Sequence, residues 1–158
     1  MKKFFMALFN IVLGIGVGFL IAKNKEIKNT HKLQEMSDKH LRLFMLMSQW
    51  VKVKQEGHDI STYFYSKGYR RIVVYGMSYI GENLILELRN SEVQILYGID
   101  VRRTGNYAGI RIVQPDEIQD DADVIVVTAV TFFDEIEENL SKKVTCPIIS
   151  LDDILYNF

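Results

Sequence analysis

The chain has 158 residues, of which 48% are hydrophobic and 25% charged, a composition typical of one globular domain with an appended segment. Its net charge of −1 conceals an asymmetry: residues 1–56 carry ten Lys/Arg against four Asp/Glu (+6), and residues 57–158 carry nine against sixteen (−7). The acidic part offers no basic stripe to neutralise phosphates, which argues against nucleic-acid binding. The single cysteine, Cys146, excludes an intramolecular disulfide, and its setting VTCPIIS predicts a buried, unreactive thiol.

The first predicted element is a membrane anchor. Residues 4–22, FFMALFNIVLGIGVGFLIA, contain no charge, and nineteen helical residues rise roughly 28 Å, close to the thickness of the hydrocarbon core. A secretory signal would have a shorter apolar core and a small-x-small cleavage site, and a buried helix would have a polar face. The pattern therefore favours an uncleaved transmembrane helix within a segment 1–23.

The flanking cations predict the orientation of this anchor. Two lysines precede the span, and six cations follow it: Lys23, Lys25, Lys28, Lys32, Lys39 and Arg42. The positive-inside rule then makes the protein single-pass with its C-terminal domain in the cytoplasm. The bilayer is thus an expected partner, and Gly14 and Gly18 form a G-x-x-x-G pair that would allow a homodimer.

Residues 24–68 are expected to form connecting helices. Apolar residues and one histidine repeat at spacings 3, 4, 3, 4, 3: Leu33, Met36, His40, Leu43, Met47 and Trp50. The stripe is too short for a firm coiled coil, so it predicts packing on the domain or on a partner chain. Gly57 ends this helix, and a short second helix closes at Gly68, with Asp59 or Ser61 as its N-cap.

Residues 69–158 alternate short β-branched runs with helical stretches. Strands are expected at Arg71–Tyr75, Val93–Asp100, Ile110–Val113, Asp123–Thr128 and Pro147–Leu151, and helices at 79–88, 134–143 and 152–157. Near-continuous Val/Ile runs indicate strands buried on both faces. The prediction is an α/β fold: a doubly wound parallel five-stranded Rossmann-like sheet in the order 3-2-1-4-5, with an irregular loop at 101–109.

Ligands of such sheets bind beyond the carboxyl ends of the strands, at the switch point. The stretch VVYGMSYIGENLI places Gly76 and Gly81 as in the dinucleotide fingerprint G-x-G-x-x-G, but Ser78 replaces the middle glycine. The predicted ligand-binding residues are those at the strand ends: Gly76, Met77, Ser78, Tyr79, Gly81, Asp100, Arg102 and Thr128. Asp100 is expected to accept from ribose hydroxyls or to pair with Arg102 or Arg103, and Glu82 would repel a phosphate. The two arginines could instead meet a phosphate or an acidic partner.

The segment 70–100, RRIVVYGMSYIGENLILELRNSEVQILYGID, resembles the Rossmann-like domain of membrane-bound bacterial polysaccharide-biosynthesis proteins, and the resemblance covers roughly residues 69–151. These include nucleotide-sugar dehydratases and lipid-linked sugar-phosphate transferases. The resemblance implies a nucleotide cofactor, NAD(P) or a nucleotide-sugar. It matches Gly76 and Gly81 to the phosphate-loop glycines and Asp100 to the ribose-binding acid, whereas Ser78 departs from the pattern.

Three functions stay open at this level. The first is a membrane-anchored, non-catalytic nucleotide-binding module beside polysaccharide-assembly enzymes such as a glycosyltransferase. The second is a protein–protein interaction scaffold with a degenerate Rossmann fold. The third is an NAD(P)-dependent nucleotide-sugar-modifying enzyme that needs a partner subunit. Catalytic motifs and metal-ligand spacings are missing from the sequence, and the Tyr63/Lys67 pair precedes the first strand, so a non-catalytic module is favoured.

Overall fold

The computed structural model describes the backbone of residues 2–119 and 121–158 and the side chains of residues 22–119 and 121–158. The chain divides into two compact units, residues 1–43 and residues 44–158. Helix α1 (Lys2–Gln55) runs through the first unit and contributes its last turns to the second. Among the described residues, no helix is long and apolar enough to cross a membrane. The predicted span 4–22 lies, except for Ala22, outside the residues whose side chains are described.

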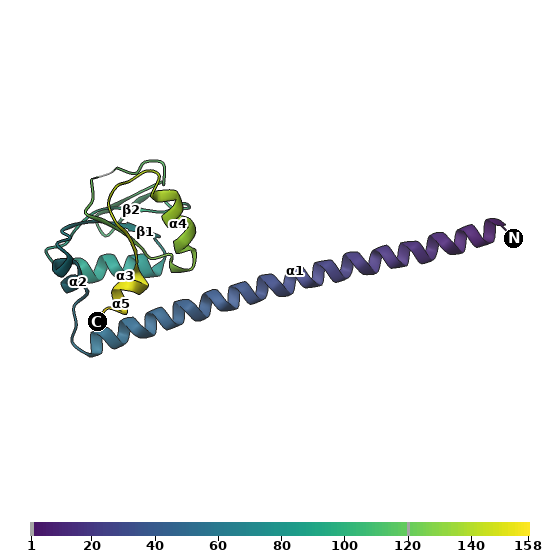
Figure 1. Ribbon diagram of the computed structural model, residues 1–158, viewed down its shortest axis with the longest axis horizontal. Coiled ribbons are helices and arrows are strands. Elements are labelled where there is room, and N and C mark those ends of the chain that lie inside the picture. The colour runs from purple at the N-terminus through teal and green to yellow at the C-terminus, as the bar shows by residue number, and fades with distance from the viewer. Residues whose placement is uncertain (1, 120) are drawn as a thin grey trace. The chain divides into compact units, whose positions relative to one another are not determined.

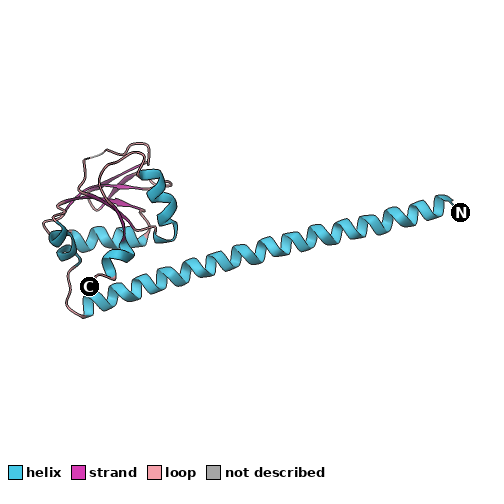
Figure 2. Ribbon diagram, in the orientation of Figure 1, coloured by secondary structure: helices cyan, strands magenta, loops and turns pink. Residues whose placement is uncertain are grey.

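The second unit is a mixed α/β domain (Figure 2). Its helices are α2 (Ile60–Lys67), α3 (Tyr79–Leu88), α4 (Phe133–Leu140) and α5 (Leu151–Leu155), with a 3-10 turn η1 (Val130–Phe132) before α4. Its strands are β1 (Arg71–Tyr75), β2 (Gln94–Ile99), β3 (Gly105–Tyr107), β4 (Ile110–Val113), β5 (Val124–Val127) and β6 (Ile148–Ser150). They form one sheet in the order β3-β4-β2-β1-β5-β6.

Five of these strands are parallel and lie in the predicted order, and the sixth corrects the prediction. The connection 101–109, expected to be irregular, contains β3, which pairs antiparallel with β4. A tight turn joins the two strands, and Ala108 (φ 52°) and Gly109 (φ 89°) both lie in the left-handed region. Such turns match the twist of a hairpin, but an alanine there conceals the usual Asn-Gly signal.

The sheet is covered on both faces, as a doubly wound fold requires (Figure 1). Val73 and Ile125 face α4 and pack with Leu140 in a buried cluster. Because side chains alternate along a strand, Ile72 and Val74 point to the opposite face, where α3 and α5 lie. The completely apolar strand β5, VIVV, is buried at every position, as expected for a central parallel strand.

The last turns of α1 belong to this domain. Leu46, Trp50 and Val53 are at most 6% exposed, and Gln49 Nε2 donates to Leu155 O of α5 at 3.0 Å. The predicted packing of the heptad stripe on the domain is thus confirmed at Trp50. Leu33 and Met36, in the first unit, are 66% and 48% exposed, and packing of this part on a partner chain stays a prediction. Asp59, not Ser61, caps α2, because its side chain accepts from Ser61 N.

Candidate functional site

The loop Gly76–Ser78 joins β1 to α3 at the switch point of the sheet, where β1 lies between β2 and β5. Gly76 adopts φ 101°, and a Cβ there would come within 2.8 Å of Thr128 Oγ1. A Cβ on Gly81 would collide with the carbonyl oxygen of Gly76. Both glycines are therefore needed where the fingerprint predicts them, for the tight turn and for the close approach of helix and loop.

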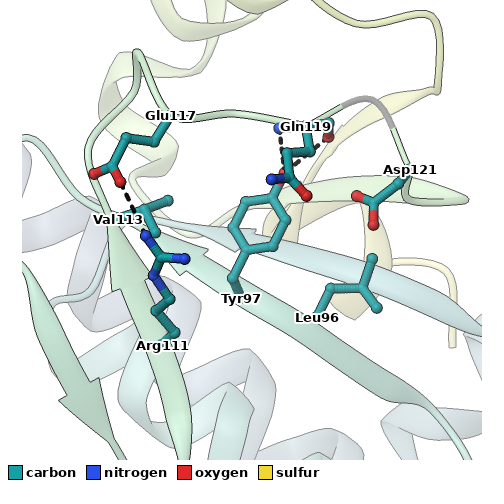
Figure 3. A pocket seen from close by; sticks show the side chains of 7 residues that line it. All are labelled: Leu96, Tyr97, Arg111, Val113, Glu117, Gln119 and Asp121. Atoms are coloured by element: carbon teal, nitrogen blue, oxygen red, sulfur yellow. Dashed lines mark hydrogen bonds and ion pairs between the residues drawn. The ribbon is translucent and has the colours of Figure 1, made fainter.

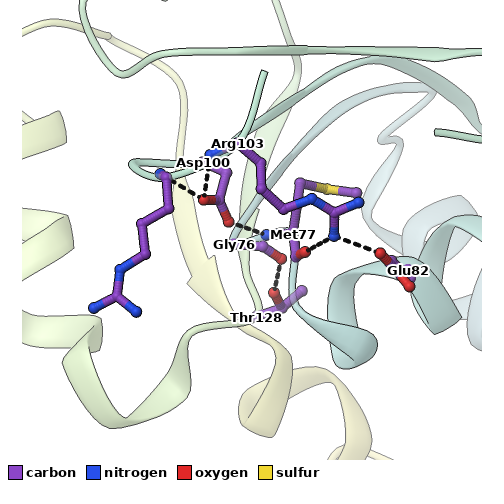
Figure 4. Close-up of polar contacts among 7 residues, drawn as sticks. Gly76, Met77, Glu82, Asp100, Arg103 and Thr128 are labelled. Carbon is purple, nitrogen blue, oxygen red and sulfur yellow. Dashed lines mark hydrogen bonds and ion pairs between the residues drawn. The ribbon is translucent and has the colours of Figure 1, made fainter. Parts of the chain in front are cut away.

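Met77 is held through both of its peptide groups (Figure 4). Asp100 Oδ2 accepts from Met77 N at 2.8 Å, and Arg103 Nη1 donates to Met77 O at 2.8 Å. Met77 as a whole is 1% exposed, so this residue, predicted to bind a ligand, shapes the loop and offers a ligand almost no surface. Gly98 makes room for it, because a Cβ at that position would come within 2.8 Å of Met77 Sδ.

Asp100 follows β2 and binds backbone amides instead of an arginine side chain. Its Oδ1 accepts from Arg102 N at 2.8 Å and from Arg103 N at 3.1 Å, while its Oδ2 binds Met77 N. Asp100 thus contacts both arginines, as the predicted alternative proposed, but through hydrogen bonds from their backbone N–H groups and not through an ion pair. Asp100 consequently joins the end of β2 to the loop after β1.

Thr128, which follows β5, supports the loop from the other side. Its hydroxyl lies 2.6 Å from Gly76 O and 3.1 Å from Tyr75 O, and the residue is 1% exposed. It is therefore a loop-positioning residue and has no surface to offer a ligand. Burial, together with the charges of Asp100 and Glu135, raises the pKa of the nearby Tyr75 phenol.

Ser78 and Tyr79 are the exposed residues of the loop. Ser78 is the N-cap of α3 with an extended backbone (φ −77°), and its side chain makes no capping hydrogen bond. Tyr79 is 54% exposed, and Arg102 is also exposed. The structure thus brings all eight predicted residues together around one loop, with Ser78, Tyr79 and Arg102 outermost.

The ion pair between Arg103 and Glu82 also belongs to the site, and the sequence does not predict it. Arg103 Nη1 donates to Glu82 Oε1 in the first turn of α3, and this pairing raises the pKa of the guanidinium. The two residues are 21 positions apart, so no local pattern joins them. The hint in the sequence was the position of Arg103 just past the end of β2, the strand beside β1.

Residues 68–147, about half of the chain, match the model of a family described as C2185-like, N-terminal. The chain belongs to this family. No curated protein and no solved structure matches the chain. The C2185-like N-terminal region runs from just before β1 to just before β6, so it contains the complete glycine loop, Asp100 and Thr128.

The C2185-like N-terminal region also contains a cavity of about 500 Å³ away from the glycine loop (Figure 3). Tyr97 Oη closes it by accepting from Gln119 N at 2.9 Å and donating to Gln119 O at 2.8 Å, and Arg111 pairs with Glu117 at 3.0 Å. These groups hold the connection between β4 and β5, whose described residues, 114–119 and 121–123, form no helix. The third charged residue of the cavity lining, Asp121, pairs with Arg71 at 3.2 Å. Each charge of the lining therefore already has a partner, and the glycine loop remains the stronger candidate.

Among the described residues, no three His, Cys, Asp or Glu side chains are placed to hold a metal ion. Tyr63 and Lys67 lie on α2, where the lysine Nζ is 5.9 Å from the tyrosine ring centroid. Burial is the main cause that raises the pKa of Tyr63, which disfavours its phenolate at neutral pH. α2 precedes β1, outside the loops at the switch point, so this pair has no position from which to act on a ligand there.

Proposed function

We propose that the chain is a membrane-anchored, non-catalytic module that binds the diphosphate of a nucleotide or nucleotide-sugar at the N-terminus of α3. The observation that carries this is Ser78: it begins α3 at the switch point, is exposed, and leaves the helix without a side-chain cap. The first amides of a helix and its dipole attract anions, and a phosphate would supply the missing acceptor.

Asp100 retains capacity for a ribose. An ionised carboxylate has about four acceptor sites, and three are used by Met77 N, Arg102 N and Arg103 N. One ribose hydroxyl can therefore donate to Asp100 without release of the loop. This accounts for an acid that both shapes the loop and lies where the ribose of a bound nucleotide would be.

The remaining parts of the proposal rest on the sequence. Residues 4–22 would anchor the chain as a single-pass helix, and the cations after it would keep the domain in the cytoplasm. The place in cell-surface polysaccharide assembly, beside a glycosyltransferase or a similar enzyme, rests on the resemblance of residues 70–100. Alkaline extraction of membranes tests the anchor: the full chain should stay in the pellet and a chain lacking residues 1–23 should not.

Ligand binding is tested by thermal unfolding of the full chain in detergent micelles with NADH, NADPH or UDP-glucose. A ligand that binds only the folded state at 100 times its Kd adds about 2.7 kcal/mol, or roughly 10 °C for a domain of this size. The matched control is Ser78→Asp. Its carboxylate would cap α3 and raise the melting temperature of the free protein, but it would repel a phosphate.

A second candidate, an interaction scaffold, is favoured by the apolar groove between α1 and α3. The groove has a volume of about 550 Å³ and is bordered by Val51 (52% exposed) and Leu86 (44% exposed). If none of the ligands raises the melting temperature, the scaffold replaces the nucleotide-binding module. If the isolated chain instead converts a nucleotide-sugar with NAD(P), the third alternative, an enzyme, is favoured. That result would also show that the enzyme does not need a partner subunit.

A further inference from the structure

Arg103 lies beside the first turn of α3 (Figure 4). It is therefore close to the place proposed for the diphosphate. Its Nη1 donates both to Met77 O and to Glu82 Oε1. The Arg103 side chain is 50% exposed and that of Glu82 is 25% exposed, so solvent and solutes reach the pair. An anion bound at the N-terminus of α3 would therefore lie close to this ion pair.

A cation at this end of a helix is unfavourable, because the helix dipole places partial positive charge there. Glu82 offsets that cost by accepting from Arg103. A phosphate could do the same, and its oxygens would also accept from the first amides of the helix. The ligand phosphate and Glu82 are therefore competitors for one guanidinium.

The backbone of Arg103 is held in place independently of the partner that its guanidinium binds. Arg103 N donates to Asp100 Oδ1 at 3.1 Å, and the same carboxylate holds Met77 N. Only the end of the arginine side chain has to change partner, while the strand end and the loop stay in place. The reorganisation is thus confined to one exposed ion pair.

We propose that Arg103 is the phosphate-recognition residue of this site and that it exchanges Glu82 for a ligand phosphate. This inference rests on the proposed nucleotide-binding function and names its ligand class: compounds that contain a diphosphate. A nucleoside without phosphate cannot replace Glu82 and gains nothing from Arg103. Glu82 consequently weakens the binding of ligands that carry phosphate and leaves the binding of an uncharged nucleoside unaffected.

The test is calorimetric titration of the full chain in detergent micelles with inorganic pyrophosphate, UDP and uridine. Glu82→Gln removes the competitor and one nearby negative charge, and it should raise the affinity for pyrophosphate and UDP on the order of tenfold or more. Arg103→Gln should lower both affinities by a similar factor. If Arg103 only supports the loop, Glu82→Gln acts through lost repulsion alone and should raise affinity equally with Arg103 present or replaced by Gln. Exchange instead predicts that most of the gain disappears in the Glu82→Gln/Arg103→Gln double variant.

Glu138→Gln is the matched control, because Glu138 of α4 pairs at 3.0 Å with Lys142, which follows the helix, and the variant removes the same charge from another exposed pair. It should leave the affinities unchanged; an equal gain would mean that net charge alone acts and would overturn the proposal. Thermal melting of each variant verifies folding. If UDP binds the wild type and neither Glu82→Gln nor Arg103→Gln alters its affinity, the exchange is wrong while the nucleotide-binding function stands. If neither the wild type nor Glu82→Gln binds pyrophosphate or UDP, both proposals fail.

Discussion

Asp100 Oδ2 accepts from the backbone N–H of Met77 at 2.8 Å and so ties the end of β2 to the loop that begins α3. The same carboxylate also accepts from Arg102 N and Arg103 N. These three hydrogen bonds shape the loop.

Asp100→Ala should destabilise the domain by about 1–3 kcal/mol, because three backbone donors lose their common acceptor. Asp100→Asn, which keeps one acceptor oxygen, should cost less. Chemical unfolding measures both, with fluorescence of Trp50, the single tryptophan of the chain, as the probe. Wild-type stability of the alanine variant would mean that the loop does not need Asp100.

Gly81→Ala is predicted to destabilise the domain by about 1–3 kcal/mol, although alanine is the better helix former by about 1 kcal/mol. The reason is the collision of the new Cβ with the carbonyl oxygen of Gly76. Asn83→Ala, at an exposed position of the same helix, is the control and should be neutral or slightly stabilising. The measurement is thermal unfolding by circular dichroism; equal effects of the two variants would refute the close approach of loop and helix.

The sequence predicts most helices and strands of this molecule, but it does not predict the contacts between side chains from different strands and helices. The spans of α3, β1 and β4 follow directly from apolar runs and glycines, because their periodicity is local. β3 was missed because three residues, Gly-Asn-Tyr, carry no strand pattern and their turn contains an alanine at positive φ. The contacts of Arg103 with Glu82 and of Tyr97 with Gln119 depend on how strands pair, which no local pattern encodes.

The junction between α1 and the domain gives a third prediction. Trp50→Ala should destabilise residues 44–158 by about 3–5 kcal/mol, because Trp50 is only 6% exposed. Phe44→Ala, at a residue 71% exposed on the same helix, should change stability by less than about 0.5 kcal/mol. Melting curves of the two variants decide this. A large loss for Phe44→Ala would show that the exposed face of α1 is covered in the folded protein.

Acid should weaken the domain through two carboxylates with lowered pKa values. Hydrogen bonds from Arg70 N and Arg71 N, both at 2.7 Å, lower the pKa of Asp123, and hydrogen bonds from Ser61 lower that of Asp59. A carboxylate whose pKa is lower in the folded than in the unfolded state stabilises the folded state at pH values above the ordinary carboxyl pKa of about 3.9. This stabilisation is lost as the pH falls through the lower pKa of the folded state. Melting temperatures below about pH 4 should therefore drop, and less steeply in Asp123→Asn, which is already weaker at pH 7. If the melting temperatures of the wild type and Asp123→Asn fell equally steeply with pH, the lowered pKa of Asp123 would not be the cause of the acid sensitivity.

The central claim, that the Gly76–Tyr79 loop binds a diphosphate, is tested most directly by amide hydrogen exchange of the full chain with and without saturating UDP-glucose. We expect slower exchange at residues 77–82 and unchanged exchange at residues 111–119, which border the other cavity. In Ser78→Asp, the ligand should cause no slowing at the loop. Unchanged exchange at residues 77–82, or slowing confined to residues 111–119, would contradict the account.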